Sequence, residues 1–299
     1  MSVQGGVMHN YLKHLPKQWP VIEAMAKAVF KPADASGGKT IHETTLPAVD
    51  AELVSDFIDW AGAAQAQYPQ TIPAHLFPQW GFPFLAANIE TLPYPMQKVL
   101  NQGCEISQKG LLPLGEDLRV ACHLVEVREE EARVRIHQRL TTGTAAQPDL
   151  IACDLFGVVV TGKSAKKSSR VQEDENPWLP VGGWTASPNE GLSFAMLTGD
   201  FNPIHWVGPY AKHAGFNNAI LHGFASLSRT YETLLQNAPT SIPYLPRINV
   251  RFTRPLVLPN RMEVHIQEGN PTKVRLVDEN GVVCMAGDYS LESSSAADS

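Results

Sequence analysis

Residues 199–205 read Gly-Asp-Phe-Asn-Pro-Ile-His and place a carboxylate and an imidazole five positions apart, on either side of an Asn-Pro step. Proline fixes its own φ, and the residue before a proline avoids helical dihedrals. Asn202 favours a turn because its side chain can hydrogen-bond to nearby backbone. We therefore expect the chain to bend between Asp200 and His205, so that both side chains can face one small volume.

Two interpretations of this bend are open. A carboxylate and an imidazole that converge on one point can activate a water molecule and move its proton. The same residues also fit a helix start, with Asn202 as the N-cap and Pro203 in the first helical position. One segment can serve both purposes, so the spacing alone does not choose between them.

The residues around the bend extend the pattern. The run at 197–205 is Leu-Thr-Gly-Asp-Phe-Asn-Pro-Ile-His, and it is followed by Tyr210-Ala211, by Gly215-Phe216 and by Ala-Ile-Leu-His-Gly at 219–223. This pattern resembles that of the MaoC-type (R)-specific enoyl-thioester hydratases and dehydratases, whose signature is G-D-x-N-P-x-H with a later hydrophobic-His-Gly step. The resemblance covers residues 185–292 well and the N-terminal half only in outline.

The resemblance implies a hydro-lyase that reversibly hydrates trans-2-enoyl thioesters to (3R)-hydroxyacyl thioesters, linked to CoA or to an acyl-carrier protein. It implies that Asp200 and His205 share one catalytic water, with Asn202, Pro203 and His222 as supporting residues of the site. An imidazole suits this role because its ordinary pKa lies near working pH.

Gly223 is the candidate oxyanion donor. A glycine lets the backbone approach a ligand closely, and the first turn of a helix adds the positive end of the helix dipole. Its backbone N–H could therefore stabilise the thioester oxygen as negative charge develops there. Tight packing of the helix is the other reason for a glycine at this position.

Composition limits the other possibilities. The chain has 299 residues, 43% of them apolar, and a formal charge of −6, which gives no basic field for binding nucleic acid. The four cysteines, at 104, 122, 153 and 284, form no C-x-x-C pair, and we expect them to be reduced in a cytoplasmic protein. No cofactor or metal is expected, because no glycine-rich phosphate loop follows a strand and His205, His213 and His222 have a poor ligand spacing. No apolar run is long enough to span a membrane.

The chain divides near its middle. Residues 162–180 are polar, charged and rich in proline, which is typical of a linker, and they separate an N-terminal domain (1–161) from a C-terminal domain (181–299). In the C-terminal half, helical periodicity at 219–236 precedes strand-like runs at 247–253, 262–267, 272–278 and 282–291. In the N-terminal half, an apolar stretch at 84–100 precedes strand-like runs at 104–108, 118–127, 132–140 and 150–161. We therefore expect an α+β protein of two fused hot-dog domains, each a curled antiparallel sheet around a central helix, as in the resembled family.

An internal comparison supports duplication. Residues 112–120 align with residues 256–264, and residues 57–63 align with residues 194–200. Ala63 then stands at the position of Asp200, and Tyr68 at that of His205, so the N-terminal unit lacks the acid–base pair. We expect one active site per chain, and a lost second site could widen a channel for a long acyl chain. A further amphipathic pattern at 20–30 predicts a helix that packs across the domain pair rather than on a membrane surface.

Two other functions remain as alternatives. A hot-dog acyl thioesterase would act on the same substrates but release free thiol, and a non-catalytic acyl-thioester-binding subunit would need another protein for activity. The paired units would allow either a monomer or a homodimer of double chains.

Overall fold

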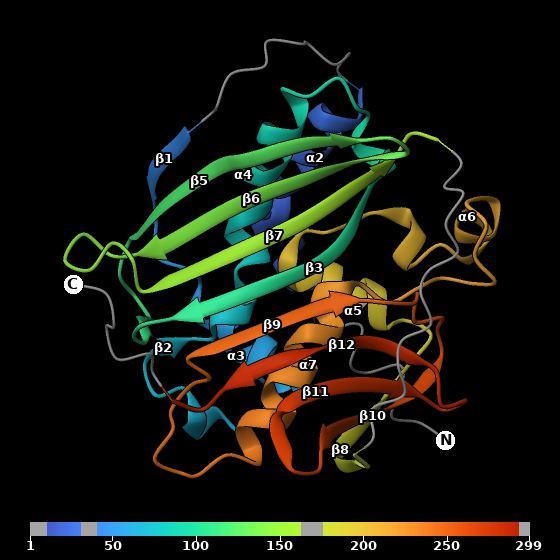
Figure 1. The fold of residues 1–299 in the computed structure, drawn as a ribbon. Helices are drawn as coiled ribbons and strands as arrows, with labels where there is room; N and C mark the ends of the chain where they lie inside the picture. Colours follow the sequence, from blue (N-terminus) through green and yellow to red (C-terminus); the bar gives the residue numbers. More distant parts are fainter. Residues whose placement is uncertain (1–10, 31–40, 163–175, 293–299) are drawn as a thin grey trace.

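The computed structural model describes residues 11–30, 41–162 and 176–292, and the fold is α+β, as predicted. Figure 1 shows one broad sheet with helices packed against its inner face. The N-terminal half contains η1 (Leu12–Gln18), α2 (Trp19–Phe30), β1 (Ile41–Leu46), α3 (Ala51–Ala61), η2 (Gln65–Gln67), β2 (Thr71–Ile72), η3 (Ala74–Leu76), α4 (Pro78–Glu90), η4 (Met96–Lys98), β3 (Val99–Gln108), β4 (Leu112–Pro113), β5 (Leu118–Glu130), β6 (Arg133–Gly143) and β7 (Ile151–Val160). The C-terminal half contains β8 (Trp178–Ala186), α5 (Glu190–Thr198), η5 (Pro203–His205), α6 (Gly208–His213), α7 (Gly223–Gln236), β9 (Arg247–Phe252), β10 (Asn260–Gln267), β11 (Asn270–Asp278) and β12 (Val283–Ser290).

Ten of the strands form one antiparallel sheet in the order β1-β5-β6-β7-β3-β9-β12-β11-β10-β8. The order is a mirrored repeat, because each half contributes five strands and the two halves meet where β3 pairs with β9, with Cys104 opposite Val250. On the outer face of this seam, Arg247 of β9 donates to Glu105 of β3 at 2.8 Å and also pairs with Asp288 of β12. The chain thus closes the junction between its halves with both backbone and side-chain contacts.

A small structural detail repeats in the two halves. Ile72 pairs with Leu112 in the two-stranded sheet β2-β4, and Ile220 forms an equivalent bridge with Val257. Both short pairs precede the third sheet strand of their half, β5 and β10, within one residue of the positions that the internal sequence alignment matched. The helices α3 and α5 also end alike, at the left-handed glycines Gly62 (φ 85°) and Gly199 (φ 84°).

The central helix of the C-terminal half is α7, which contacts β8, β9 and β10. Its buried residues include Leu227, Tyr231 and Leu234, which follow the periodicity expected for residues 219–236. The first four residues of that predicted range are extended rather than helical, because Ile220 and Leu221 pair with the segment at 256–257.

The helix predicted at 84–100 in the N-terminal half is present, but it begins earlier and overlaps the predicted range only at 84–90. The helix there is α4 (Pro78–Glu90), and residues 99 and 100 already belong to β3. Pro78 lies in the first turn, where a proline costs no hydrogen bond, while Pro83 is tolerated inside the helix. The helix ends before Pro93 and Pro95, as proline chemistry requires. The eight predicted strands are all present, with ends shifted by a few residues.

The range predicted as a linker is only partly described. Residues 163–175 lie outside the described residues, and β8 begins at Trp178, so the last three residues of the range are strand. Their pairing with β10 places them within the sheet. The division into domains at 1–161 and 181–299 stays a prediction.

The N-terminal helix α2 packs against the body of the protein, as predicted, and contacts α4. Just before it, the Gln18 side chain donates to the Met196 carbonyl at 3.0 Å, and Val21 packs directly on Gly199. Among the described helices, none combines the length and the apolar character needed to cross a membrane.

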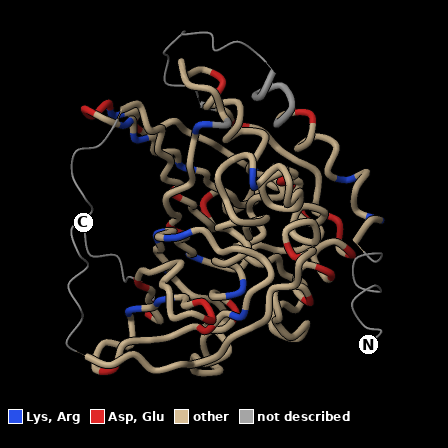
Figure 2. Tube along the Cα trace, turned by 90° about the vertical axis from the view of Figure 1, so that its right-hand side faces the viewer, with Lys and Arg blue, Asp and Glu red and all other residues tan. Residues whose placement is uncertain are grey.

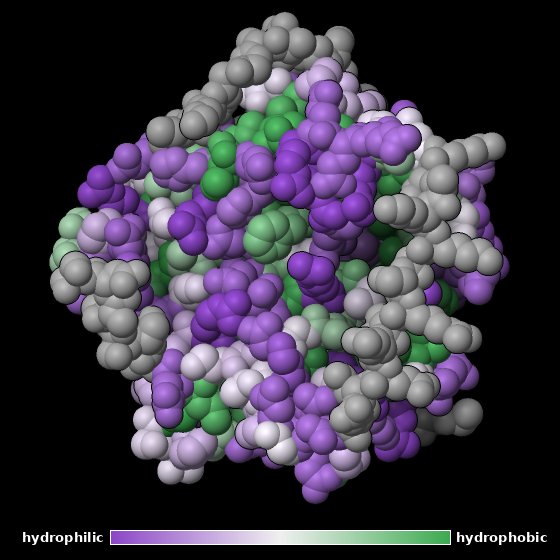
Figure 3. All heavy atoms as spheres, viewed as in Figure 1, coloured by the Kyte–Doolittle hydropathy of each residue, from purple (hydrophilic) through white to green (hydrophobic). Residues whose placement is uncertain are grey.

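The face of the sheet shown in Figure 3 is largely hydrophilic, with small apolar areas between the polar ones. On the side shown in Figure 2, Lys and Arg residues are mixed with Asp and Glu residues and form no continuous positive area. This distribution agrees with the absence of a basic field inferred from the net charge.

Candidate active site

The bend at 199–205 is built by a helix end followed by a short helix start. Gly199 adopts the left-handed conformation that ends α5, and the next backbone N–H groups are taken up locally. The Asp200 side chain accepts from Asn202 N–H at 3.3 Å, and Asn202 Oδ1 accepts from Ile204 N–H at 3.3 Å. Pro203 occupies the first position of η5. The helix-start interpretation is therefore confirmed, and it also orients Asp200 and His205.

His205 is held by the segment that leads into α7. Its Nδ1 lies 2.8 Å from the Ile220 carbonyl, and the Ile220 N–H donates to the Ile204 carbonyl at 3.1 Å. Because a carbonyl can only accept, Nδ1 carries the proton and Nε2 of the neutral ring is an acceptor. Nε2 of His205 is therefore the ring nitrogen that can accept a proton from a bound molecule.

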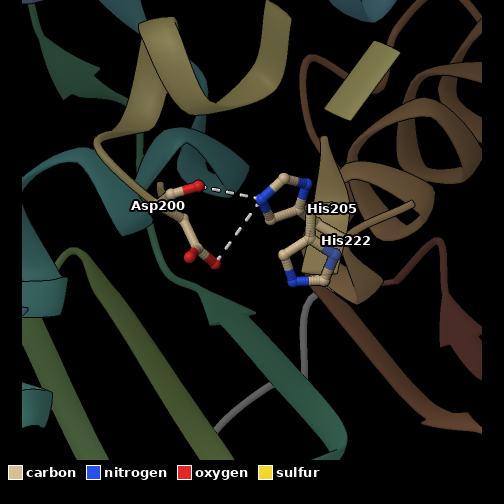
Figure 4. A group of neighbouring side chains, drawn as sticks. All are labelled: Asp200, His205 and His222. Carbon is tan, nitrogen blue, oxygen red and sulfur yellow. Dashed lines mark hydrogen bonds and ion pairs between the residues drawn. The ribbon is translucent and has the colours of Figure 1, made fainter. Parts of the chain in front are cut away.

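His222 connects the bend to the central helix. It is buried, it precedes α7 as the N-cap residue, and its Nε2 donates to the Asp200 carbonyl at 3.0 Å while lying 3.8 Å from the Asp200 carboxylate (Figure 4). Its ring stacks on that of His205, with the ring centroids 3.6 Å apart and the planes inclined by 26°. The three side chains Asp200, His205 and His222 thus converge, and His222 supports the other two.

One carboxylate oxygen of Asp200 and one ring nitrogen each of His205 and His222 lie within 4.8 Å of one another. Two hydrogen bonds of about 2.8 Å that meet at a near-tetrahedral angle span about 4.6 Å, so one water can bridge Asp200 and His205. The side chain of Asp200 is 14% exposed and His205 is half-buried, so the pair borders solvent rather than lying sealed in the core.

Burial sets the protonation states of the three groups. Loss of solvation raises the pKa of the Asp200 carboxyl above its ordinary value, while the nearby His205 and the Asn202 N–H act in the opposite direction. Loss of solvation also lowers the pKa of His205, against the opposing pull of Asp200. The same burial, reinforced by His205, lowers the pKa of His222 well below the ordinary value. At neutral pH both imidazoles are therefore uncharged.

These three residues are also the described group that comes closest to a metal site. A metal needs ligand lone pairs that converge at about 2.0–2.2 Å. Nδ1 of His205 and Nε2 of His222 each donate to a carbonyl, and the remaining lone pairs lie in two nearly parallel ring planes. The geometry suits two stacked neutral rings better than two ligands of one ion.

Gly223 begins α7, beside the stacked rings. The His222 side chain makes no capping hydrogen bond, and the first N–H groups of a helix have no partner within the helix. A Cβ added at Gly223 would lie 2.7 Å from the Phe252 ring, so packing alone already requires a glycine here. Packing against Phe252 thus explains the glycine at position 223. Its N–H lies in the first turn of α7, where it can also donate a hydrogen bond to a ligand.

Two supporting features were missed from the sequence. A Cβ at Gly191 of α5 would lie 1.9 Å from the His205 carbonyl oxygen, so this glycine allows the bend to lie against the helix. Glu190 accepts from Arg229 of α7 at 2.6 Å and from the Ser187 N–H at 3.3 Å. The spacing Ser187-x-x-Glu190 is that of a capping box, which is the signal that could have identified it.

A surface depression of about 480 Å³ lies elsewhere, in the N-terminal half, and is lined by Glu43, Thr44, Thr45, Asp117, Arg119 and Ala145. None of the predicted site residues borders it. Its volume therefore adds nothing to the chemistry of the Asp–His pair.

Known proteins resemble this chain both in sequence and in fold. Residues 171–286, which make up less than half of the chain, match the family model of the MaoC like domain. The chain is 28% identical over 152 residues to the mouse peroxisomal multifunctional enzyme type 2, and 35% identical over 84 residues to 3-hydroxyacyl-thioester dehydratase X of Mycobacterium tuberculosis. These alignments cover 47% and 28% of this chain but only 20% and 29% of the two relatives.

Solved structures share the fold over much more of the chain. The crystal structure of HtdX from M. tuberculosis superposes with a TM-score of 0.68 at 17% identity, over 84% of this chain and 99% of that one. A MaoC-like dehydratase from Phytophthora capsici gives 0.67 at 17% identity, over 90% and 99%. The N-terminal half therefore belongs to the same hot-dog architecture, although the family model matches the C-terminal part.

Proposed function

We propose that this protein reversibly hydrates trans-2-enoyl thioesters to (3R)-hydroxyacyl thioesters, as an (R)-specific enoyl-CoA hydratase or 3-hydroxyacyl-thioester dehydratase. The observation that carries the proposal is the pairing of Asp200 with a neutral His205 beside the first turn of α7. The match to the MaoC like domain and the dehydratase named among the relatives support the same reaction class.

The chemistry follows from the protonation states. Asp200 and Nε2 of His205 hold one water and accept one of its protons, which raises the nucleophilicity of the water oxygen. This oxygen forms a bond to C3 of the enoyl group, and the electrons of the double bond move toward the thioester oxygen. The abstracted proton is then delivered to C2, so the enzyme returns to its starting state. General acid–base catalysis of this kind contributes about 10²–10⁴-fold in rate.

The Gly223 N–H is the proposed partner of the thioester oxygen. As negative charge develops on this oxygen, an N–H at a helix N-terminus stabilises it, and such a donor typically contributes about 10²–10³-fold. Asn202 and Pro203 hold the bend, while His222 holds the Asp200 backbone. We also propose that the protein acts in a reducing compartment such as the cytoplasm, because its four buried cysteines are unpaired.

The direct test measures the loss of enoyl absorbance when purified protein is mixed with crotonyl-CoA. A coupled (3R)-specific dehydrogenase should oxidise the product, whereas a (3S)-specific dehydrogenase should not. A thiol reagent in a parallel assay distinguishes the alternatives, because thiol release would identify a thioesterase. Neither absorbance loss nor thiol release, from the protein alone, would favour a non-catalytic thioester-binding subunit.

A further inference from the structure

The position in the N-terminal half that corresponds to the active site is filled by a buried polar network. Tyr68, which stands where His205 stands in the other half, donates its hydroxyl to Glu232 of α7 at 2.5 Å. His75 Nε2 lies 2.6 Å from the same carboxylate oxygen. Tyr68 is 6% exposed, His75 1% and Glu232 2%. The lost site is therefore closed by side chains from both halves and does not form the wide channel that Ala63 and Tyr68 suggested.

The interior between the two positions is also filled. A continuous series of ring contacts runs from the active site to the buried network, with successive centroids 3.6 to 5.6 Å apart. Each ring therefore packs directly on the next. The series is His205, His222, Phe194, Trp60, Phe57 and His75.

A second aromatic group closes the region inward from Gly223. Phe224 follows this glycine, and its ring lies 5.2 Å from that of Phe77 and 5.9 Å from that of Phe82 on α4. Phe224 and Phe82 are 7% and 8% exposed, and Phe77 is fully buried. On the sheet side, Phe252 packs against Gly223 itself. A thioester carbonyl at the Gly223 N–H would thus have aromatic rings on its inner side.

We propose that the site is specific for short-chain enoyl thioesters and that Phe82, packed on Phe224, closes its inner end. This inference rests on the proposed function for the place of the thioester. Extra methylenes forced into a packed core displace side chains and are unfavourable. A long acyl chain that reached the Tyr68–Glu232–His75 network would also bury apolar carbons against a carboxylate that needs its polar partners.

The test uses binding as well as turnover. The dissociation constants of the saturated esters butyryl-CoA, octanoyl-CoA and dodecanoyl-CoA are measured by calorimetry on the full-length protein, because these esters cannot be hydrated. An open channel would tighten binding about fourfold for each buried methylene. We expect affinity to be flat or to fall with chain length, and affinity that rises steeply from butyryl to dodecanoyl would overturn the proposal.

The substitution Phe82→Ala should open the inner end and tighten dodecanoyl-CoA binding at least about tenfold, with little change for butyryl-CoA. Ile89→Ala is the matched control, since Ile89 lies on the same helix and is similarly buried, at 4%, but packs in the separate cluster with Leu92 and Leu124. Phe82→Leu serves as a milder second variant if the alanine variant fails to fold. A folded Phe82 variant with unchanged chain-length dependence would refute the role of this ring.

Turnover separates this inference from the function on which it rests. Hydration of crotonyl-CoA should exceed that of trans-2-dodecenoyl-CoA in kcat/KM by at least about tenfold. If the protein hydrates neither ester but binds butyryl-CoA more tightly than dodecanoyl-CoA, the proposed hydratase activity is wrong and the proposed short-chain specificity of the site is supported. A protein that hydrates dodecenoyl-CoA better would confirm the hydratase and contradict the short-chain site.

Discussion

Gly191 on α5 lies so close to the backbone of His205 that a methyl group on Gly191 would fall 1.9 Å from the His205 carbonyl oxygen. Glycine inside a helix is ordinarily unfavourable relative to alanine, by about 0.5–1 kcal/mol. Its presence in α5 is explained by this contact, which lets the bend at residues 199–205 lie directly on the helix that leads into it.

The first prediction concerns this contact. Gly191→Ala should lower kcat by at least about tenfold, because His205 must move away while Asp200, at the end of the same helix, stays in place. Steady-state kinetics with crotonyl-CoA would measure the loss. Gly162→Ala is the control, since an added Cβ there meets its nearest neighbour at an ordinary 3.6 Å. Equal kinetics in the two variants would contradict a positioning role for Gly191.

The second prediction concerns the acid–base pair. Asp200→Asn and His205→Ala should each lower kcat by at least about 10², because each removes one of the groups that hold and deprotonate the water. Circular dichroism should show intact folding in both variants. Near-wild-type turnover in either one would refute the assignment.

The third prediction is the pH dependence of kcat. The reaction needs neutral His205, whose pKa lies below the ordinary value of about 6.5, and ionised Asp200, whose pKa lies above about 3.9. Activity should therefore be constant from neutral pH upward and fall on the acid side between about pH 6.5 and pH 4. Crotonyl-pantetheine is used as the substrate because it lacks the phosphates of CoA, so that no ionisation of the substrate contributes to the pH dependence of kcat. A midpoint above neutral pH would be inconsistent with a neutral His205 whose pKa is lowered by loss of solvation.

The fourth prediction follows from the cost of burying Asp200. The pKa of Asp200 is higher in the folded than in the unfolded protein. The contribution of this group to the free energy of unfolding is therefore fully present at low pH, and it is lost as the pH rises through the pKa of the folded state. Asp200→Asn should therefore raise Tm at pH 8, and the gain should shrink as pH falls toward the ordinary carboxyl range. Calorimetry at several pH values measures this difference. A variant less stable than wild type at pH 8 would show that hydrogen bonds outweigh desolvation at this position.

The fifth prediction concerns the buried network of the N-terminal half. Tyr68→Phe removes a hydrogen bond to a buried carboxylate and should lower the free energy of unfolding by about 1.5–3 kcal/mol. Tyr289→Phe is the matched control, because Tyr289 is 8% exposed and has no side-chain hydrogen bond among the described residues. Activity of Tyr68→Phe well below its Tm should match wild type. A loss of kcat without a loss of stability would mean that Tyr68 acts on the active site.

Local patterns in the sequence predicted the local features of the fold. Alternating apolar residues identified the strands, and the 3.6-residue period identified α7. The N-terminal helix was placed too late in the chain because the apolar stretch at 84–100 continues into the next strand, β3, and a run of apolar residues does not separate a helix from a strand.

Contacts between residues that are distant in the chain could not be predicted from the sequence. The Asp200–His205 pair was predictable because five residues and one proline determine it. The hydrogen bond from Tyr68 to Glu232 joins residues 164 positions apart, and no local pattern indicates it. The close approach of Gly191 to His205 likewise depends on how two elements pack, which the spacing of the motif does not contain.

The pairing of β3 with β9 within one chain has a consequence for how the protein responds to dilution. Two separate hot-dog chains meet by a second-order encounter, and their complex dissociates when the protein becomes scarce. Here the encounter is intramolecular, and its effective concentration is set by the length of the connecting segment rather than by expression level. The helix that carries Gly223 thus keeps its neighbouring half even at the lowest cellular abundance.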